Sequence, residues 1–217
     1  MNTPLRNYQG ASAEDRIQGR RQLLLEVAFE AMATEEWRGM SINQLCRLAE
    51  LNKRYFYESF ASLDEIAAAV IDDMSSHLIH IAVTTAAEGV QAGLPNIEVA
   101  RKVLPAVLSW LLDDERRARV LFGEIAGLPL ARENRRRVIK TLAQAVSQYG
   151  HEHYKAGGKA YPEAELISSL LMGGTVEAVL NWLDGGIVMS REQFMQDMAV
   201  LWNLNGDAVA AMVEKRS

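Results

Sequence analysis

The sequence is poor in cysteine: Cys46 is the only one among 217 residues, so no disulfide can form within the chain. Paired cysteines are typical of small secreted proteins, and their absence favours the reducing cytoplasm. The opening segment MNTPLRNYQGASAEDR is polar and lacks the apolar core of a signal peptide. No unbroken apolar run reaches the roughly 18 residues that a membrane-spanning helix needs. We therefore expect a cytoplasmic protein with no membrane partner.

The motifs of common enzyme classes are also missing. We find no glycine-rich phosphate loop, no G-x-S-x-G and no H-E-x-x-H, and no Glu-x-x-His pair of the kind that builds a metal site in a helical bundle. His77 and His80, with Asp73 one turn earlier, could hold a divalent metal, but no obvious fourth ligand accompanies them. We expect no enzyme, no cofactor and no metal site. A metal-binding helical bundle remains an alternative.

Strand signals are weak, whereas Ala, Leu, Glu and Arg recur at helical spacing, which predicts an all-α chain of about nine or ten helices. Capping boxes at 41–44, 62–65 and 190–193 mark three helix starts. We expect a disordered arm over 1–12, a helix-turn-helix domain over 13–62 and a larger helical domain over 63–217. The expected helices are 13–34, 42–49, 53–59, 63–88, 97–112 (capped by Asn96 and kinked or divided at Pro105), one within 113–127, 130–155, 163–184 and a last one from 191, with a break at 205–206.

The segment LAELNKRYFYESF, residues 48–60, places cations beside a run of aromatic residues. Two short helices joined by a tight turn, beside a longer helix, form a helix-turn-helix, whose second helix can enter the major groove of DNA. In the second helix Phe56 and Phe60 share an inward face. Lys53 and Arg54 are left outside, where they can donate to guanine or phosphate. Residues 1–60 are neutral overall, so the chain's net charge of -5 lies in the remainder.

From Arg20 to Ile66 the sequence resembles the DNA-binding domain of TetR-type (tetracycline-repressor-type) transcriptional regulators. The matching positions, in one register without a gap, are Val27, Ala28, Trp37, Ser41, Leu45, Cys46, Ala49, Leu51, Tyr57, Phe60 and Ile66. Three positions depart from the family pattern. Glu36 and Glu50 replace glycines, so that Glu50 is expected at positive φ, and Leu63 replaces a lysine that would contact phosphate.

The resemblance implies a role in DNA binding for eight residues. Base reading is expected from Lys53, Arg54 and Tyr55, with Asn43 assisting and Asn52 beside them, and phosphate contacts from Ser41, Tyr57 and Ser59. Arg20 and Arg21 are expected to meet the DNA backbone from the first long helix. The segment 1–19, with Arg6 and Arg16, is expected to reach a minor groove, and Arg38 is a further phosphate candidate. Cys46 is expected to be a small buried residue.

The resemblance also implies that the larger helical domain dimerises and binds a small effector. Apolar and small residues occupy more than one face of helix 163–184, and a broad apolar face recurs in the last helix. Two such helices from each of two subunits would form a four-helix interface. The residues expected there are Leu166, Leu170, Gly173, Gly174, Phe194, Met198, Leu201 and Trp202.

A two-fold dimer would read a palindromic operator, with half-sites about 34–36 Å apart. The family resemblance implies a repressor that leaves double-stranded DNA when it binds a largely apolar effector. Residues expected to line the effector site are Leu78, Leu108, Trp110, Phe122, Tyr149, Met172, Val176 and Trp182. One alternative stays open, a helical binding module that has lost DNA reading, because of the departures at Glu36, Glu50 and Leu63.

Overall fold

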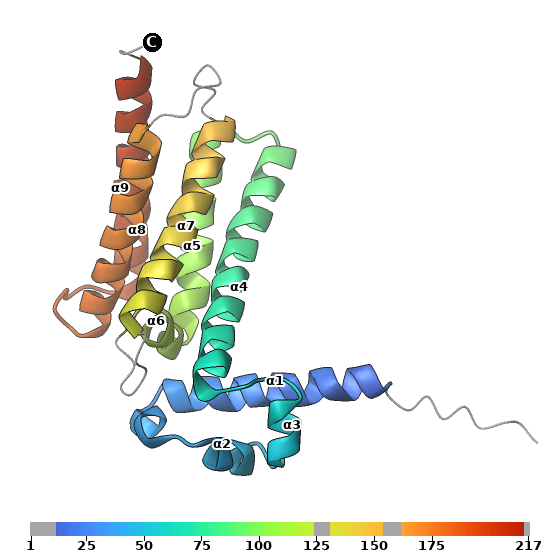
Figure 1. Cartoon of the computed structure of the whole chain (residues 1–217). Coiled ribbons are helices and arrows are strands. Elements are labelled where there is room, and N and C mark those ends of the chain that lie inside the picture. The colour runs from blue at the N-terminus through green and yellow to red at the C-terminus, as the bar shows by residue number, and fades with distance from the viewer. Residues whose placement is uncertain (1–11, 124–130, 154–161, 215–217) are drawn as a thin grey trace, which may run out of the picture. The chain divides into compact units, whose positions relative to one another are not determined.

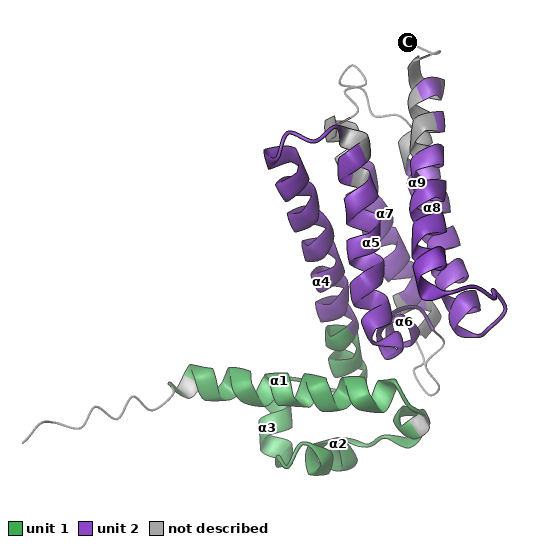
Figure 2. Cartoon of the chain, turned by 180° about the vertical axis from the view of Figure 1, so that it is seen from behind, with its two compact units in different colours: residues 1–70 green, residues 71–217 purple. Residues whose placement is uncertain are grey.

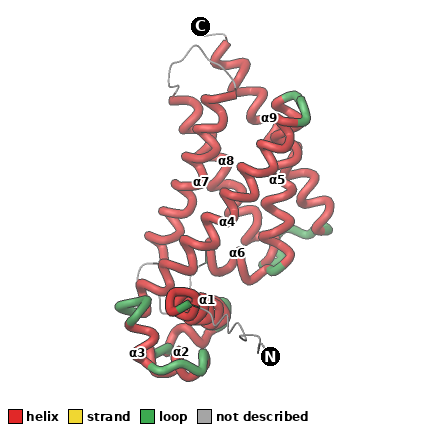
Figure 3. Tube along the Cα trace, turned by 90° about the vertical axis from the view of Figure 1, so that its right-hand side faces the viewer, coloured by secondary structure: helices red, strands yellow, loops and turns green. Residues whose placement is uncertain are grey.

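The computed structural model describes residues 12–123, 131–153 and 162–214, and in these ranges every regular element is helical (Figure 3). Nine α-helices and one 3₁₀ helix lie in the described part, which confirms the all-α prediction. The chain divides into two compact units, residues 1–70 (unit 1) and 71–217 (unit 2), coloured separately in Figure 2. The expected arm lies outside the described residues, except for Ser12.

Unit 1 is a small three-helix arrangement followed by the start of a long helix (Figure 1). Its elements are α1 (Ala13–Met32), the 3₁₀ helix η1 (Glu35–Gly39), α2 (Ile42–Leu48), α3 (Lys53–Tyr57) and the first turns of α4 (Leu63–Gln91). Each of α1, α2 and α3 packs against the other two. Buried apolar side chains from these elements form its core, among them Leu24, Ala28, Trp37, Leu45, Phe56 and Ile66.

Unit 2 contains the rest of α4 and five further helices, several of which run alongside one another (Figure 1). They are α5 (Asn96–Asp113), α6 (Glu115–Phe122), α7 (Ala131–His153), α8 (Pro162–Leu183) and α9 (Arg191–Glu214). The main helix pairs are α7 with α8 and α5 with α9. The core includes Leu78, Leu108, Leu121, Val138, Val176 and Val179.

Serine hydroxyls cap the helices at the positions that the sequence predicts. The hydroxyl oxygen accepts the backbone N–H of the third helical residue at Ser41 (3.3 Å, from Gln44), Ser62 (3.1 Å, from Glu65) and Ser190 (3.1 Å, from Gln193). A fourth cap, at the start of α1, is one that the sequence analysis missed. There Ser12 and Asp15 form a reciprocal capping box, and its hydrogen bonds lower the pKa of the Asp15 carboxyl.

Neither Pro105 nor Asn205 divides its helix, and one cap differs. The assigned helix α5 continues through Pro105, because buried leucines on both sides, Leu104 and Leu108, anchor it to the core. The last helix continues through Asn205, whose side-chain amide donates to the Leu201 carbonyl one turn earlier (2.7 Å). At the start of α5, Pro95 occupies the cap position without a side-chain hydrogen bond.

Two helices are long and apolar enough to cross a membrane by length and composition, Leu63–Gln91 and Glu165–Leu183. Neither helix contains an unbroken apolar run of about 18 residues, so neither is expected from the sequence to cross a membrane. The same test is passed by helices that supply one face to the core of a helical protein, as α4 does with Ile71, Met74 and Leu78. Length and composition alone are therefore weak grounds for a membrane span.

The turn between α2 and α3 is a Schellman motif with a strained residue. The Leu51 N–H donates to the Cys46 carbonyl (2.8 Å) and the Glu50 N–H to the Arg47 carbonyl (3.2 Å). This pattern needs a left-handed residue, and Glu50 has φ +52° as expected. The ends of α4 and α8 show the same pair of hydrogen bonds, but there the left-handed residues are Gly93 and Gly185.

Glu50→Gly is predicted to stabilise the chain, because glycine adopts positive φ without the steric penalty of a side chain. We expect the free energy of unfolding to rise by about 1 kcal/mol in urea titrations. Glu50→Ala is the control: it removes the same carboxylate but keeps a Cβ at positive φ, so it should leave stability nearly unchanged. Equal gains for both variants would assign the effect to charge and contradict the strain.

Candidate nucleic-acid interface

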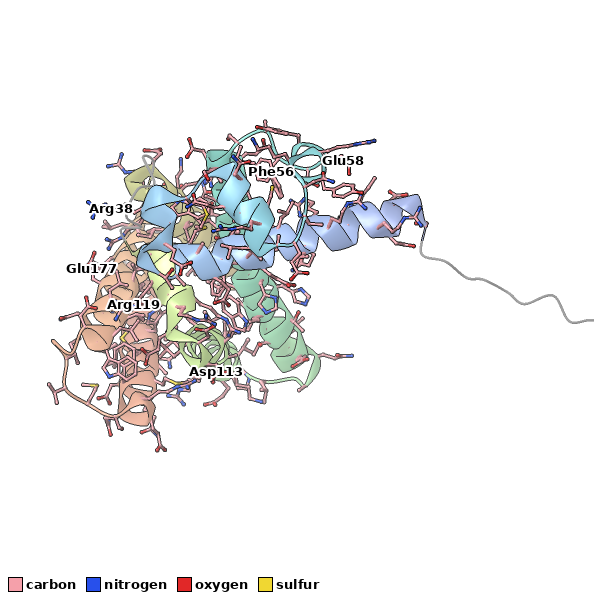
Figure 4. The ribbon with its side chains drawn as sticks, turned by 90° about the horizontal axis from the view of Figure 1, so that it is seen from below. Arg38, Phe56, Glu58, Asp113, Arg119 and Glu177 are labelled. Atoms are coloured by element: carbon pink, nitrogen blue, oxygen red, sulfur yellow. The ribbon has the colours of Figure 1, made fainter. Side chains whose placement is uncertain are left out.

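The orientation of α3 is set by one aromatic side chain. Phe56 is fully buried and lies within 5.5 Å of the Tyr57 ring and 5.9 Å of the Phe60 ring, measured between centroids. Figure 4 labels Phe56 in the interior of unit 1. With this residue facing inward, Arg54, two positions earlier, lies on the opposite side of the short helix.

The outward positions of α3 carry the expected cations. Lys53 and Arg54 are the first two residues of the helix and both are exposed; the Arg54 side chain retains 85% of its accessible surface. Arg54 lies 3.5 Å from Glu58, an i,i+4 ion pair that leaves it accessible. Tyr57 is 57% exposed, and Asn43 is exposed on α2. Residues at the start of a recognition helix are those that reach base edges.

Three of the residues expected to contact DNA also form local hydrogen bonds within unit 1. Asn52 caps α3, because its side-chain oxygen accepts the Tyr55 N–H (3.3 Å). Besides capping α2, the Ser41 hydroxyl donates to the Gln44 side-chain oxygen (2.7 Å). Ser59 is half-buried just beyond α3, where its N–H donates to the Phe56 carbonyl (2.9 Å). Of these, Asn52 and Ser41 hold the ends of the two short helices.

The arginines of α1 lie against α3. Arg20 forms an ion pair with Glu58 (2.9 Å), and its guanidinium carbon is 4.2 Å from the centroid of the Tyr55 ring. Arg21 lies 5.1 Å above the Phe60 ring. Both arginines are expected from the sequence to meet the DNA backbone. Their contacts with residues near position 58, almost 40 residues along the chain, are not predicted by any local pattern.

Cys46 is buried beneath the turn between α2 and α3, with 4% of its surface exposed. Burial raises the pKa of its thiol, and the positive charge of Lys53 opposes this to a smaller extent. At neutral pH the thiol is protonated and shielded, as expected of a small core residue.

Helix α8 has two different faces. One face is buried in unit 2 and includes Ser168, Met172, Thr175, Val176 and Val179. On the other, Leu166 is 72% exposed and Leu170 63% exposed. A Cβ added at Gly173 or Gly174, about one turn after Leu170, would meet no atom within 4 Å. An apolar stripe thus runs along the outside of α8.

Helix α9 also exposes an apolar stripe, formed by Val200, Leu201 and Leu204. The structure turns other expected interface residues inward. Phe194 is buried and stacks on Trp182 (5.2 Å between ring centroids), and Met198 is buried. The Trp202 ring N–H donates to the Thr175 hydroxyl (2.7 Å), which joins α9 to α8. We call Leu166, Leu170, Gly173, Gly174, Val200, Leu201 and Leu204 the α8/α9 apolar surface.

Comparison with known proteins gives structural matches alone. No protein-family model matches the chain, and no curated protein matches it in sequence. The fatty acid degradation regulator FadR from Bacillus halodurans matches with a TM-score of 0.67 at 12% identity, over 85% of this chain and 94% of that one. A proposed TetR-family transcriptional regulator from Syntrophomonas wolfei matches with a TM-score of 0.67 at 15% identity, over 89% and 96%. A gamma-butyrolactone receptor (ArpA-like protein) matches with a TM-score of 0.52 at 15% identity, over 93% and 99%.

The chain has the TetR-regulator fold. The match spans both units, so the resemblance seen in residues 20–66 extends to the architecture of nearly the whole chain. At these identities the comparison bears on the fold, and the chemistry of each surface has to be judged from this chain's own residues.

In this TetR-type fold the residues expected around an effector occupy different environments. Most are buried in the core of unit 2: Leu78, Leu108, Phe122, Met172 and Val176. Trp110 is half-buried between the His77 ring (4.8 Å) and the Arg117 guanidinium (4.6 Å), and Arg117 also donates to its carbonyl (2.6 Å). The half-buried Trp182 donates to the Met189 carbonyl (3.0 Å). The Tyr149 side chain lies outside the described residues.

The residues considered for a metal site do not assemble into one. Within the described ranges, no three His, Cys, Asp or Glu side chains come together in a way that could hold a metal ion. His77 instead packs on Trp110. This arrangement provides no support for the metal-binding alternative.

Asn52→Ala is predicted to lower the free energy of unfolding by about 1 kcal/mol, because the first turn of α3 loses its cap. Asn52→Ser keeps an oxygen that can accept the Tyr55 N–H, so it should retain most of the stability. Urea unfolding of both variants measures the difference. If serine and alanine destabilise the chain equally, the side chain of Asn52 does not act as a cap.

Proposed function

We propose that this protein is a sequence-specific, double-stranded-DNA-binding transcriptional regulator that uses α3 as its reading helix. The observation that carries the proposal is the exposed pair Lys53 and Arg54 at the start of a helix fixed by the buried Phe56. Arg54 can donate two hydrogen bonds to guanine, and Lys53 can reach guanine or phosphate. Tyr57 and Asn43 lie exposed on α3 and α2 and would extend the contact to the DNA backbone and neighbouring bases.

The proposed active form is a homodimer joined through the α8/α9 apolar surface. Isolated exposed leucines are common, but here several exposed apolar residues occur on each of two helices that pack against each other. Gly173 and Gly174 would let a partner helix approach closely. A two-fold axis here would pair two copies of α3 and favour a palindromic operator.

The proposed mode of action is repression relieved by a small, largely apolar effector bound within unit 2, in the cytoplasm. Leu108, Phe122 and Val176 in its core are apolar, and the half-buried Trp110 and Trp182 add aromatic surface. Two proteins of similar structure are named as a fatty acid degradation regulator and a gamma-butyrolactone receptor. An effector would act by binding the DNA-free form more tightly than the bound form.

The direct test is selection of bound fragments from genomic DNA by the purified full-length chain. Enrichment of a palindrome supports sequence-specific reading and identifies the adjoining genes. No enrichment, even at low salt where phosphate contacts are strongest, would overturn the proposal. It would favour instead a helical binding module without DNA reading.

The double substitution Lys53→Ala and Arg54→Ala is predicted to weaken binding to the selected operator by about tenfold or more and to flatten the sequence preference. The matched control is Arg136→Ala with Lys140→Ala, which removes two exposed cations from α7 in unit 2. Fluorescence anisotropy titrations at several salt concentrations give both affinities. Equal losses in the two variants would show that net charge, rather than α3, determines binding.

Leu170→Glu is predicted to convert the dimer to a monomer, because it places a charge in the centre of the α8/α9 apolar surface. Its control is Val83→Glu, at an apolar position of α4 that is exposed to a similar degree (59%). Light scattering coupled to size exclusion measures the molar mass. A Leu170→Glu chain that remains dimeric would move the interface elsewhere.

A further inference from the structure

Arg20 contacts α3 in two ways at once. Its Nη2 donates to Glu58 Oε2 at 2.9 Å, and its guanidinium lies over the Tyr55 ring, 4.2 Å from the centroid. Less than a quarter of the side chain is exposed. Glu58 is the residue at which α3 ends, and Figure 4 labels it. One arginine of α1 therefore holds both a side chain on the proposed reading helix and the acid at its end.

The Nε of Arg20 is buried, in keeping with a position set by the contacts with α3. Within the described residues this N–H has no hydrogen-bond partner, an arrangement that is unfavourable for a buried donor. A guanidinium free to move would turn this group toward water. The ion pair with Glu58 and the cation–π contact with Tyr55 oppose that movement.

Glu58 also connects Arg20 to Arg54. Its other carboxylate oxygen, Oε1, lies 3.5 Å from Arg54 Nε, a longer contact than the one to Arg20. The two arginines contact different oxygens of one carboxylate and share its charge, and the closer contact of Arg20 weakens the attraction of Glu58 for the exposed Arg54. Without Arg20, the carboxylate would be free to pair fully with Arg54 and neutralise it.

We propose that Arg20 is a positioning residue for base reading: it fixes Tyr55 by stacking and keeps Glu58 from capturing Arg54. This inference rests on the proposed function, since it concerns how α3 reads DNA. It replaces the expectation that Arg20 contacts the DNA backbone. Arg20 thus acts on DNA only through Tyr55, Glu58 and Arg54.

The two roles predict different binding behaviour. Loss of a phosphate contact weakens binding to all sequences alike and reduces the salt dependence by about one ion per subunit. Loss of a positioning residue weakens binding to the operator selectively and leaves the salt dependence unchanged. The ratio of operator to random-DNA affinity, measured across salt concentrations, therefore separates them.

The test uses Arg20→Met, which keeps the length of the side chain and removes both the charge and the unpaired buried N–H. Glu58 is partly exposed and keeps its contact with Arg54, so its carboxylate is not left without a partner and the chain is expected to fold. We expect the affinity ratio to fall about tenfold, the strength of one good base contact, with the salt slope and random-DNA affinity unchanged. Arg20→Lys keeps the charge but lacks the planar face, and should recover only part of the ratio. The matched control, Arg21→Met, removes the neighbouring arginine on Phe60 and should leave the ratio intact.

A second measurement needs no DNA. In urea unfolding of Arg20→Met, Tyr55→Leu and the double variant, we expect a coupling of about threefold in the unfolding equilibrium constant, as a cation–π contact gives. Additive effects would overturn the proposal, as would a salt slope that falls by one ion per subunit with an unchanged affinity ratio. A parent chain that selects no sequence would overturn the proposed function itself, and with it this role of Arg20, even where the coupling is found.

Discussion

The burial of Phe56 is the contact on which the orientation of α3 in unit 1 depends. A five-residue helix is far too short to be stable alone, so α3 exists only because tertiary contacts and caps hold it. Phe56 supplies the core contact, Asn52 the cap and the Glu50 turn the entry angle. With Phe56 inward, Arg54, two positions earlier, falls on the opposite side of α3, and Lys53 is exposed at the first position of the helix.

Both units are built from helices, but the helices are stabilised in different ways. In unit 1, short helices are held by caps, a strained turn and aromatic contacts, which defines a few side-chain positions. In unit 2, long helices such as α8 place one apolar face in the core and leave a second exposed. A helix with two apolar faces is incompletely buried in a single chain, which is why the α8/α9 apolar surface is expected to meet a second copy.

The helices and their ends could largely be predicted from the sequence, because they are determined by residues that lie close together along the chain. Serine caps, glycine-rich turns and helical periodicity predicted the helices, and the departure at Glu50 predicted its positive φ. The missed features are not local. Nothing in the sequence near Arg20 indicates Glu58 as its partner. Likewise, periodicity identifies the apolar positions of α9 but cannot tell Phe194, which faces its own core, from Leu201, which faces outward.

The single thiol of the chain has a practical consequence. Cys46 is shielded by burial and its raised pKa keeps it protonated, so it offers little background in thiol chemistry. A cysteine introduced on the exposed side of α3 or α8 would then be the one site that accepts a spin label or a fluorophore. The natural sequence is in effect already prepared for spectroscopic distance measurements between subunits, with no need to delete a native residue first.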